Sequence, residues 1–152
     1  MSLDGMIHCK IIEGSYDTAQ FAEFILELVG HMQPFPAPRS VIVMDNCRIH
    51  KAPEIMEIIR ALCVNLDIKL CSTDMSRHSG MRAEFLPPYS PDFNPIELAF
   101  SVIKQRIRRD ANIFAGLLTH ADDIGIYDQL FRTVYSITSH VAYNFFHHCR
   151  YI

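Results

Sequence analysis

Apolar residues along the chain follow two spacings, one typical of strands and one typical of helices. The run at residues 41–44 is continuously apolar and leads into Asp45, which predicts a buried strand covered on both faces. Further strands are predicted at residues 6–13, between two glycines, and at residues 81–86. Strands that alternate with helices are typical of an α/β fold.

Apolar residues three and four positions apart predict the helices. The first begins after Asp17, which forms a capping-box sequence with Gln20, and ends near residues 30–32. Pro53 suits the first turn of the second helix, residues 95–109 form the third, and residues 122–152 supply two more. The positions expected to be buried are Phe21, Phe24, Ile25, Leu28, Ile55, Ile58, Ile59, Leu62, Ile96, Phe100, Ile103, Ile107, Ile126, Leu130, Val134, Ile137, Val141, Phe145 and Cys149.

Length and cysteine usage exclude several classes of protein. A chain of 152 residues suffices for one domain, and its apolar stretches are too short to cross a bilayer. The start lacks the features of a signal peptide, which predicts a soluble intracellular protein. The five cysteines are scattered without a C-x-x-C pair, which argues against a disulfide framework. His147, His148 and Cys149 would point in different directions on a helix, which argues against a metal site there.

Two carboxylates stand in settings that suit metal chemistry. Asp45 is expected at the carboxyl end of a buried strand, and Glu97 in the first turn of the helix over residues 95–109. Carboxylates in these places can hold a divalent metal for phosphoryl transfer. Taken singly, each has a structural alternative: Asp45 could cap the next turn, and Glu97 could favour the positive end of its helix.

The net charge of −3 is unfavourable for general binding of nucleic acid, which depends on Lys and Arg. Basic residues nevertheless cluster after Glu97, and Lys104 and Arg108 fall on the same flank of the predicted helix. One interpretation is contact between this flank and the DNA backbone. The other is a charged face that is simply solvated.

Two motifs resemble the DDE catalytic domain of mariner-type transposases. One is Asp45-Asn46 followed by His50, and the other is the run Leu-Pro-Pro-Tyr-Ser-Pro-Asp-Phe-Asn-Pro-Ile-Glu at residues 86–97. The resemblance implies a ribonuclease-H-like mixed sheet flanked by helices, a nuclear location, and cleavage and transfer of DNA strands with Mg²⁺ or Mn²⁺. It also implies that Asp45 and Glu97 are the second and third catalytic, metal-binding acids, with Asn46 and His50 in supporting roles.

The chain departs from that family's pattern in two ways. The family's first acid lies on a strand upstream of the region that matches Met1, so the sheet is expected to lack its first strand. We therefore expect residues 1–152 to be a partial catalytic domain that is inactive alone and prone to self-association, for example as a homodimer. The spacing between the two acids is also longer than in relatives, which predicts an insertion or loop at residues 64–79. The alternative is a domesticated, non-catalytic module that binds nucleic acid or protein.

Overall fold

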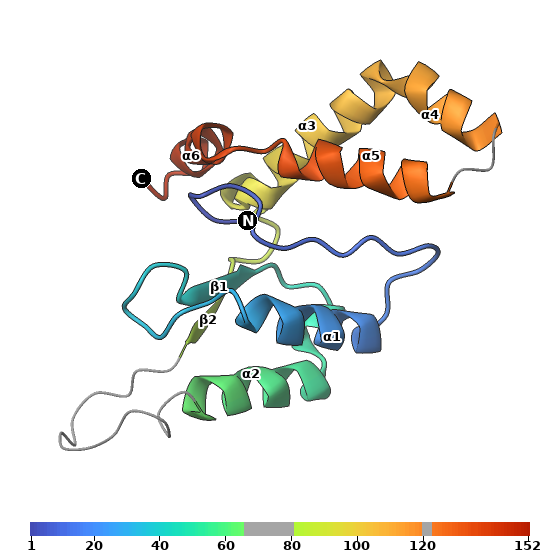
Figure 1. Ribbon diagram of the computed structural model, residues 1–152. Helices are drawn as coiled ribbons and strands as arrows, with labels where there is room; N and C mark the ends of the chain where they lie inside the picture. The colour runs from blue at the N-terminus through green and yellow to red at the C-terminus, as the bar shows by residue number, and fades with distance from the viewer. Residues whose placement is uncertain (66–80, 120–122) are drawn as a thin grey trace. The chain divides into compact units, whose positions relative to one another are not determined.

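The structure is a computed structural model that describes residues 1–65, 81–119 and 123–152. Within this part of the chain it contains six α-helices and a parallel sheet of two strands, which confirms the α/β class (Figure 1). The chain divides into two compact units. The sheet unit comprises residues 12–90, and the helical unit comprises residues 1–11 together with 91–152.

The sheet unit is built on two parallel strands, with Val41 opposite Arg82 and Met44 opposite Phe85. Its elements are α1 (Thr18–Val29), β1 (Val41–Met44), the 3₁₀ turn η1 (Ile49–Lys51), α2 (Pro53–Asn65) and β2 (Arg82–Phe85). The predicted capping box is confirmed, since the Asp17 carboxylate accepts the Gln20 N–H and the Gln20 side chain accepts the Asp17 N–H. Strand β2 lies within the predicted range of residues 81–86.

One apolar core holds the sheet unit together. Helices α1 and α2 pack on one face of the sheet, as Figure 1 shows. The buried side chains are Phe21, Ile25, Ile42, Met44, Ile55 and Ile59. The helical members of this core are predicted positions, which confirms the 3.6-residue period of α1 and α2.

The prediction that β1 is covered on both faces is wrong. Ile42 and Met44 are buried, whereas Val41 and Val43 are 38% and 39% exposed. Successive side chains of a strand point to opposite faces, so an all-apolar run still divides into two faces with different surroundings. Within the sheet unit the described helices cover only the face of Ile42 and Met44.

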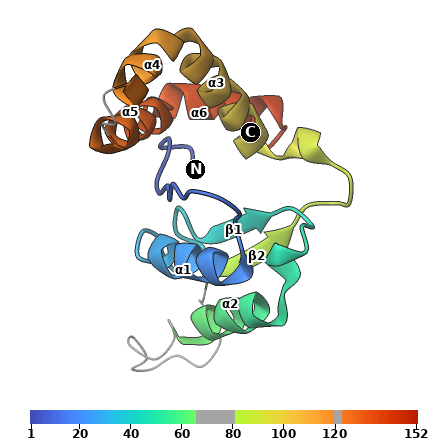
Figure 2. The ribbon, with the colours of Figure 1, turned by 90° about the vertical axis from the view of Figure 1, so that its right-hand side faces the viewer.

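The helical unit consists of four helices and the first residues of the chain (Figure 2). The helices are α3 (Pro95–Arg109), α4 (Ala111–Thr119), α5 (Asp123–Tyr135) and α6 (Ser139–His148). Helix α3 has the predicted bounds, and α5 and α6 confirm the two helices expected in residues 122–152. The core comprises Ile103, Val134, Ile137 and Ala142.

Two details of the helical unit differ from the prediction. Phe100 is 47% exposed, because Ala99 and not Phe100 continues the buried line of α3 toward Ile103. Helix α4 was missed, because its short, almost wholly apolar sequence has no polar face and no residue of it is buried.

The predicted strand at residues 6–13 is also wrong. The N–H of Met6 binds the carbonyl of Ile137 (3.3 Å), and Gly5 forms an isolated antiparallel bridge with Thr138. Met6 and Cys9 then pack against the helical core. The backbone groups at the start of this segment therefore find their hydrogen-bond partners at the corner between α5 and α6. This corner is not a strand, so the segment does not extend a sheet.

The predicted insertion at residues 64–79 lies mostly outside the described residues. Residues 64 and 65 are the last two of α2, and residues 66–80 lie outside the part of the chain that the structure describes.

Candidate functional site

Asp45 directly follows β1, at the edge of the sheet where the carboxyl ends of both parallel strands meet. Its side chain is 48% exposed. The Oδ1 atom accepts the N–H of Cys47 (2.9 Å) and lies 2.7 Å from Nδ1 of His50, an ion-pair distance without the alignment of a hydrogen bond. Both contacts use Oδ1, so Oδ2 is the oxygen that can reach a ligand.

His50 is held in place by an aromatic neighbour. It lies in η1, and its ring centroid is 4.5 Å from that of Phe21 on α1, with the ring planes 30° apart. This contact fixes the imidazole plane, and the imidazole in turn limits the rotation of the Asp45 carboxylate. The structure therefore places His50 beside Asp45 within the sheet unit, and its supporting role stays a prediction.

Asn46 connects the two sequence motifs. Its side-chain amide donates a hydrogen bond to the carbonyl of Leu86, the first residue of the run at 86–97. Leu86 follows β2 and donates its own N–H to the carbonyl of Met44 (2.8 Å). Asp45, Asn46 and His50 are thus brought together with the start of the second motif at one edge of the sheet.

The second motif continues through a proline-rich turn. Tyr89 adopts a left-handed backbone conformation (φ 57°) and is fully exposed. The hydroxyl of Ser90 donates to the carbonyl of Pro88 (3.2 Å), which closes the turn locally. Prolines hold φ near −65°, so the turn has few alternative conformations.

Glu97 belongs to the helical unit, where the sequence sets its place at the start of α3. The Asn94 side chain caps the helix by accepting the N–H of Ile96, and Pro95 fills the first position, where no N–H is required. Glu97 therefore lies in the first turn, exposed, where the helix dipole stabilises its negative charge.

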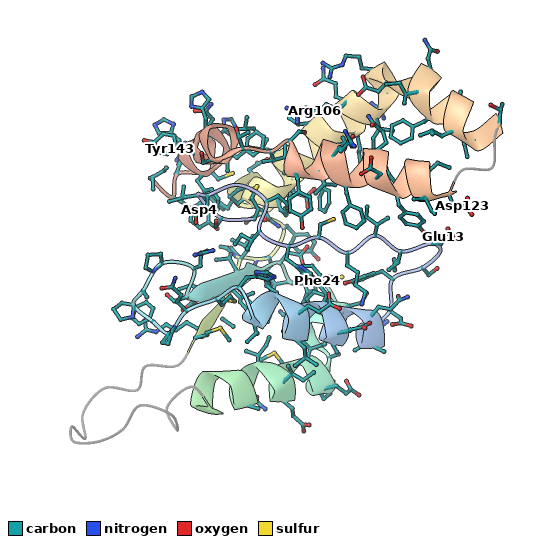
Figure 3. All side chains as sticks on the ribbon, viewed as in Figure 1. Asp4, Glu13, Phe24, Arg106, Asp123 and Tyr143 are labelled. Carbon is teal, nitrogen blue, oxygen red and sulfur yellow. The ribbon has the colours of Figure 1, made fainter. Side chains whose placement is uncertain are left out.

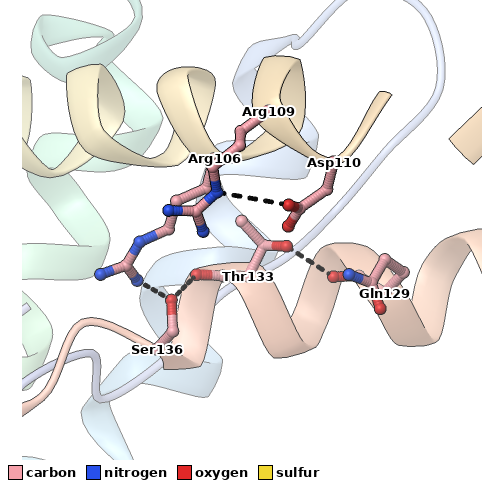
Figure 4. Close-up of polar contacts among 6 residues, drawn as sticks. All are labelled: Arg106, Arg109, Asp110, Gln129, Thr133 and Ser136. Carbon is pink, nitrogen blue, oxygen red and sulfur yellow. Dashed lines mark hydrogen bonds and ion pairs between the residues drawn. The ribbon is translucent and has the colours of Figure 1, made fainter. Parts of the chain in front are cut away.

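Lys104 and Arg108 are exposed along the flank of α3 that carries Glu97, as the helical spacing predicts. Arg106 differs from them, although it belongs to the same basic stretch. Its guanidinium donates to the hydroxyl of Ser136, which donates to the carbonyl of Thr133 near the end of α5 (Figure 4). Figure 3 shows Arg106 among the side chains of this unit. Arg106 therefore stabilises the packing of α3 against the end of α5.

Replacing Arg106 by Ala is expected to lower the free energy of unfolding by about 1–2 kcal/mol, because a partly buried Ser136 hydroxyl loses its charged donor. Urea denaturation followed by circular dichroism would measure the change. The matched control is Arg108→Ala, at an exposed position of the same helix, where a change within about 0.5 kcal/mol is expected. Equal losses in both variants would contradict the role of Arg106 in linking α3 to α5.

At the C-terminal end of α6, His147 and His148 are exposed, whereas Cys149 is buried. Burial together with the nearby Asp92 carboxylate raises the pKa of the Cys149 thiol. The free thiol is therefore protonated at neutral pH. Cys9, Cys47 and Cys149 are all free thiols.

The donor chemistry of the two acids fits a hard divalent metal. Mg²⁺ and Mn²⁺ prefer carboxylate oxygens, and both Asp45 and Glu97 present carboxylates that water can reach. Over residues 1–65, 81–119 and 123–152 no cluster of three or more His, Cys, Asp or Glu side chains could hold a metal ion. Each acid is thus suited to metal binding in its own unit.

Two supporting contacts could not be predicted from the sequence. The tilted ring contact between Phe21 and His50 and the hydrogen bond from Asn46 to Leu86 join residues that are far apart along the chain. No local spacing signals such pairs. They become visible only when α1 and β2 are placed beside the turn after β1.

Comparison with known proteins identifies the family. Residues 1–115 match the DDE superfamily endonuclease family, and this range contains both candidate acids. No curated protein and no solved structure matches the chain. Among the described helices none has the length and apolar character needed to span a membrane. Members of the matched family act on DNA and typically depend on a metal ion. The chain therefore belongs to the DDE superfamily of endonucleases.

Proposed function

We propose that this chain carries two of the catalytic acids of a mariner-type transposase, as part of a domain that in this family cleaves and transfers DNA strands with Mg²⁺ or Mn²⁺. The observation that carries the proposal is the setting of Asp45. One carboxylate oxygen is held by Cys47 and His50, and the other is left for a ligand. Asn46 ties this site to the run that leads to Glu97.

Each residue of the proposed site has a separate task. Asp45 and Glu97 would hold the metal through carboxylate oxygens, and His50 orients the first of them. The bound metal would supply Lewis-acid activation of water or a 3′-hydroxyl and would stabilise the charge of the leaving oxygen. Lys104 and Arg108 would contact the phosphate backbone of DNA along α3.

The proposed assignment to the mariner group rests on the two sequence motifs. The run at residues 86–97 and the Asp45-Asn46 pair favour the mariner group within the DDE superfamily. The pairing of parallel β1 and β2, with an acid at the carboxyl end of β1, is compatible with a ribonuclease-H-like sheet. A nuclear location is part of the proposal, because the DNA substrate of such a transposase lies there.

Manganese titration tests the proposal directly. Free Mn²⁺ would be followed by electron paramagnetic resonance as it is titrated into the wild-type chain, Asp45→Asn and Glu97→Gln. Each substitution removes one anionic ligand with little change in shape, so the affinity is expected to fall at least about ten-fold. Competition by Mg²⁺ would show that the same site takes both metals.

The matched control is Glu57→Gln, an exposed acid on α2 in the same unit. It should leave the Mn²⁺ affinity unchanged. If all four proteins bound Mn²⁺ equally weakly, the proposed metal site would be wrong. Retained DNA binding in that case would favour the non-catalytic module.

A further inference from the structure

Arg48 and Lys51 follow Asp45 by three and six positions in the chain and have no role in the proposed metal site. Arg48 precedes η1 and Lys51 is its last residue, and the N–H of Lys51 binds the carbonyl of Arg48 (3.2 Å). In a 3₁₀ turn, side chains three positions apart are eclipsed. The two side chains therefore leave the turn on the same side.

Contact with the end of β2 restricts where the Lys51 charge can lie. Its ammonium nitrogen is 5.5 Å from the centroid of the Phe85 ring, within the range of a cation–π interaction. Phe85 is paired with Met44, the residue before Asp45. The Lys51 ammonium is thus held at the edge of the sheet from which Asp45 emerges.

Neither cation is neutralised by the fold. Arg48 and Lys51 are both exposed, and neither forms an ion pair with any residue in the part of the chain that the structure describes. Glu54, the acid in the first turn of α2, is exposed and likewise has no ion pair there. Within the described residues, these two cations on one side of a short turn are available to attract an anion at the sheet edge that Asp45 follows, where the Asp45 carboxylate repels phosphate.

We infer that Arg48 and Lys51 bind the phosphodiester backbone of the DNA that enters the site of Asp45. The inference rests on the proposed function and adds a substrate contact to it. The planar guanidinium of Arg48 can bind a phosphate through two N–H groups, and the Lys51 ammonium acts as a point charge on a neighbouring phosphate. Together they offset the repulsion between Asp45 and the DNA.

Salt-dependent DNA binding tests this inference. Anisotropy of a fluorescein-labelled DNA duplex would be measured over a series of NaCl concentrations for the wild-type chain, Arg48→Gln and Lys51→Gln. Each lost phosphate contact should weaken binding several-fold at low salt and reduce the slope of log K against log salt by about 0.9. Lys51→Arg keeps the charge and should retain the wild-type slope.

The control variant is Arg60→Gln, at an exposed basic position on α2 in the same unit. It should leave the slope unchanged. The inference is overturned if Arg48→Gln and Lys51→Gln keep the wild-type slope, if Arg60→Gln lowers it equally, or if the wild-type chain shows no binding at low salt. Circular dichroism of each variant confirms that the fold is retained.

Mn²⁺ titration of the same variants separates this inference from the proposed function. Arg48→Gln and Lys51→Gln should bind Mn²⁺ at least as tightly as the wild-type chain, because neither side chain is a ligand and each substitution removes a positive charge that repels the metal. A changed salt slope with no effect of Asp45→Asn on Mn²⁺ would retain the DNA contact and reject the metal site. An unchanged slope with a clear Asp45→Asn effect would do the reverse.

Discussion

Replacing Ile55 by Ala is expected to lower the free energy of unfolding of the sheet unit by about 2–5 kcal/mol. Ile55 is completely buried in the core that joins α1 and α2 to the sheet. Its truncation removes apolar contacts and leaves a cavity that the surrounding side chains fill only in part. Urea denaturation, with hydrogen exchange to locate the loss in α1, α2 and β1, would measure the effect.

Two further variants calibrate that result. Ile55→Val removes one methylene and should cost about 0.5–1.5 kcal/mol. Leu26→Ala, at a 54% exposed position of α1, should change the stability by no more than about 0.5 kcal/mol. A loss for Ile55→Ala no larger than that for Leu26→Ala would show that this core is not packed as described.

The same variant links the core to the site. Met44 belongs to the core of Ile55 and immediately precedes Asp45, so looser packing there would let the carboxylate move away from Cys47 and His50. Ile55→Ala is therefore expected to weaken Mn²⁺ binding as well as the fold. Leu26→Ala should leave Mn²⁺ binding at the wild-type level.

Replacing Gly5 by Ala is expected to destabilise the helical unit by about 3 kcal/mol or more. Gly5 has a φ of +109°, a conformation that side chains disfavour, and a Cβ there would lie 2.6 Å from the backbone carbonyl oxygen of Ile137. The oxygen belongs to the connection between α5 and α6, so relief of the clash requires movement of backbone. Thermal and urea denaturation would measure the loss.

Gly14→Ala provides the matched control. Gly14 also has a positive φ (+85°), but an added Cβ would meet no atom within 4 Å. It should therefore show only the backbone strain, about 1–2 kcal/mol. If the two variants lost equal stability, the close approach of Gly5 to Ile137 would not contribute to the fold.

The parts of the fold that were predicted correctly are those with local causes. Asp17 and Gln20 form the start of α1 from residues three positions apart, and Asn94 with Pro95 sets the start of α3. The apolar residues of α2 recur with the helical period, so the helix and its buried face could be predicted without knowing which sheet covers that face. Such features depend on neighbours along the chain, so a pattern of a few residues suffices to predict them.

The errors concern features that depend on distant partners. Residues 6–13 have the composition of a strand, but Gly5 and Met6 find their backbone partners at the corner formed by Ile137 and Thr138. Val41 and Val43 are as apolar as their neighbours, yet their burial depends on what covers that face of β1. The spacing of apolar residues along the chain predicts neither the partners of Gly5 and Met6 nor the exposure of Val41 and Val43.

The features of the candidate site likewise divide into those with local causes and those that depend on distant partners. The sequence by itself determined the family motifs, the position of Asp45 after a strand and that of Glu97 in the first turn of a helix, because strands, caps and turns follow from local chemistry. Only the tertiary structure decided that the rings of His50 and Phe21 are in contact, that Asn46 donates to Leu86 and that Arg106 donates to Ser136. These contacts join separate elements, and their geometry arises only once a shared core has packed those elements together.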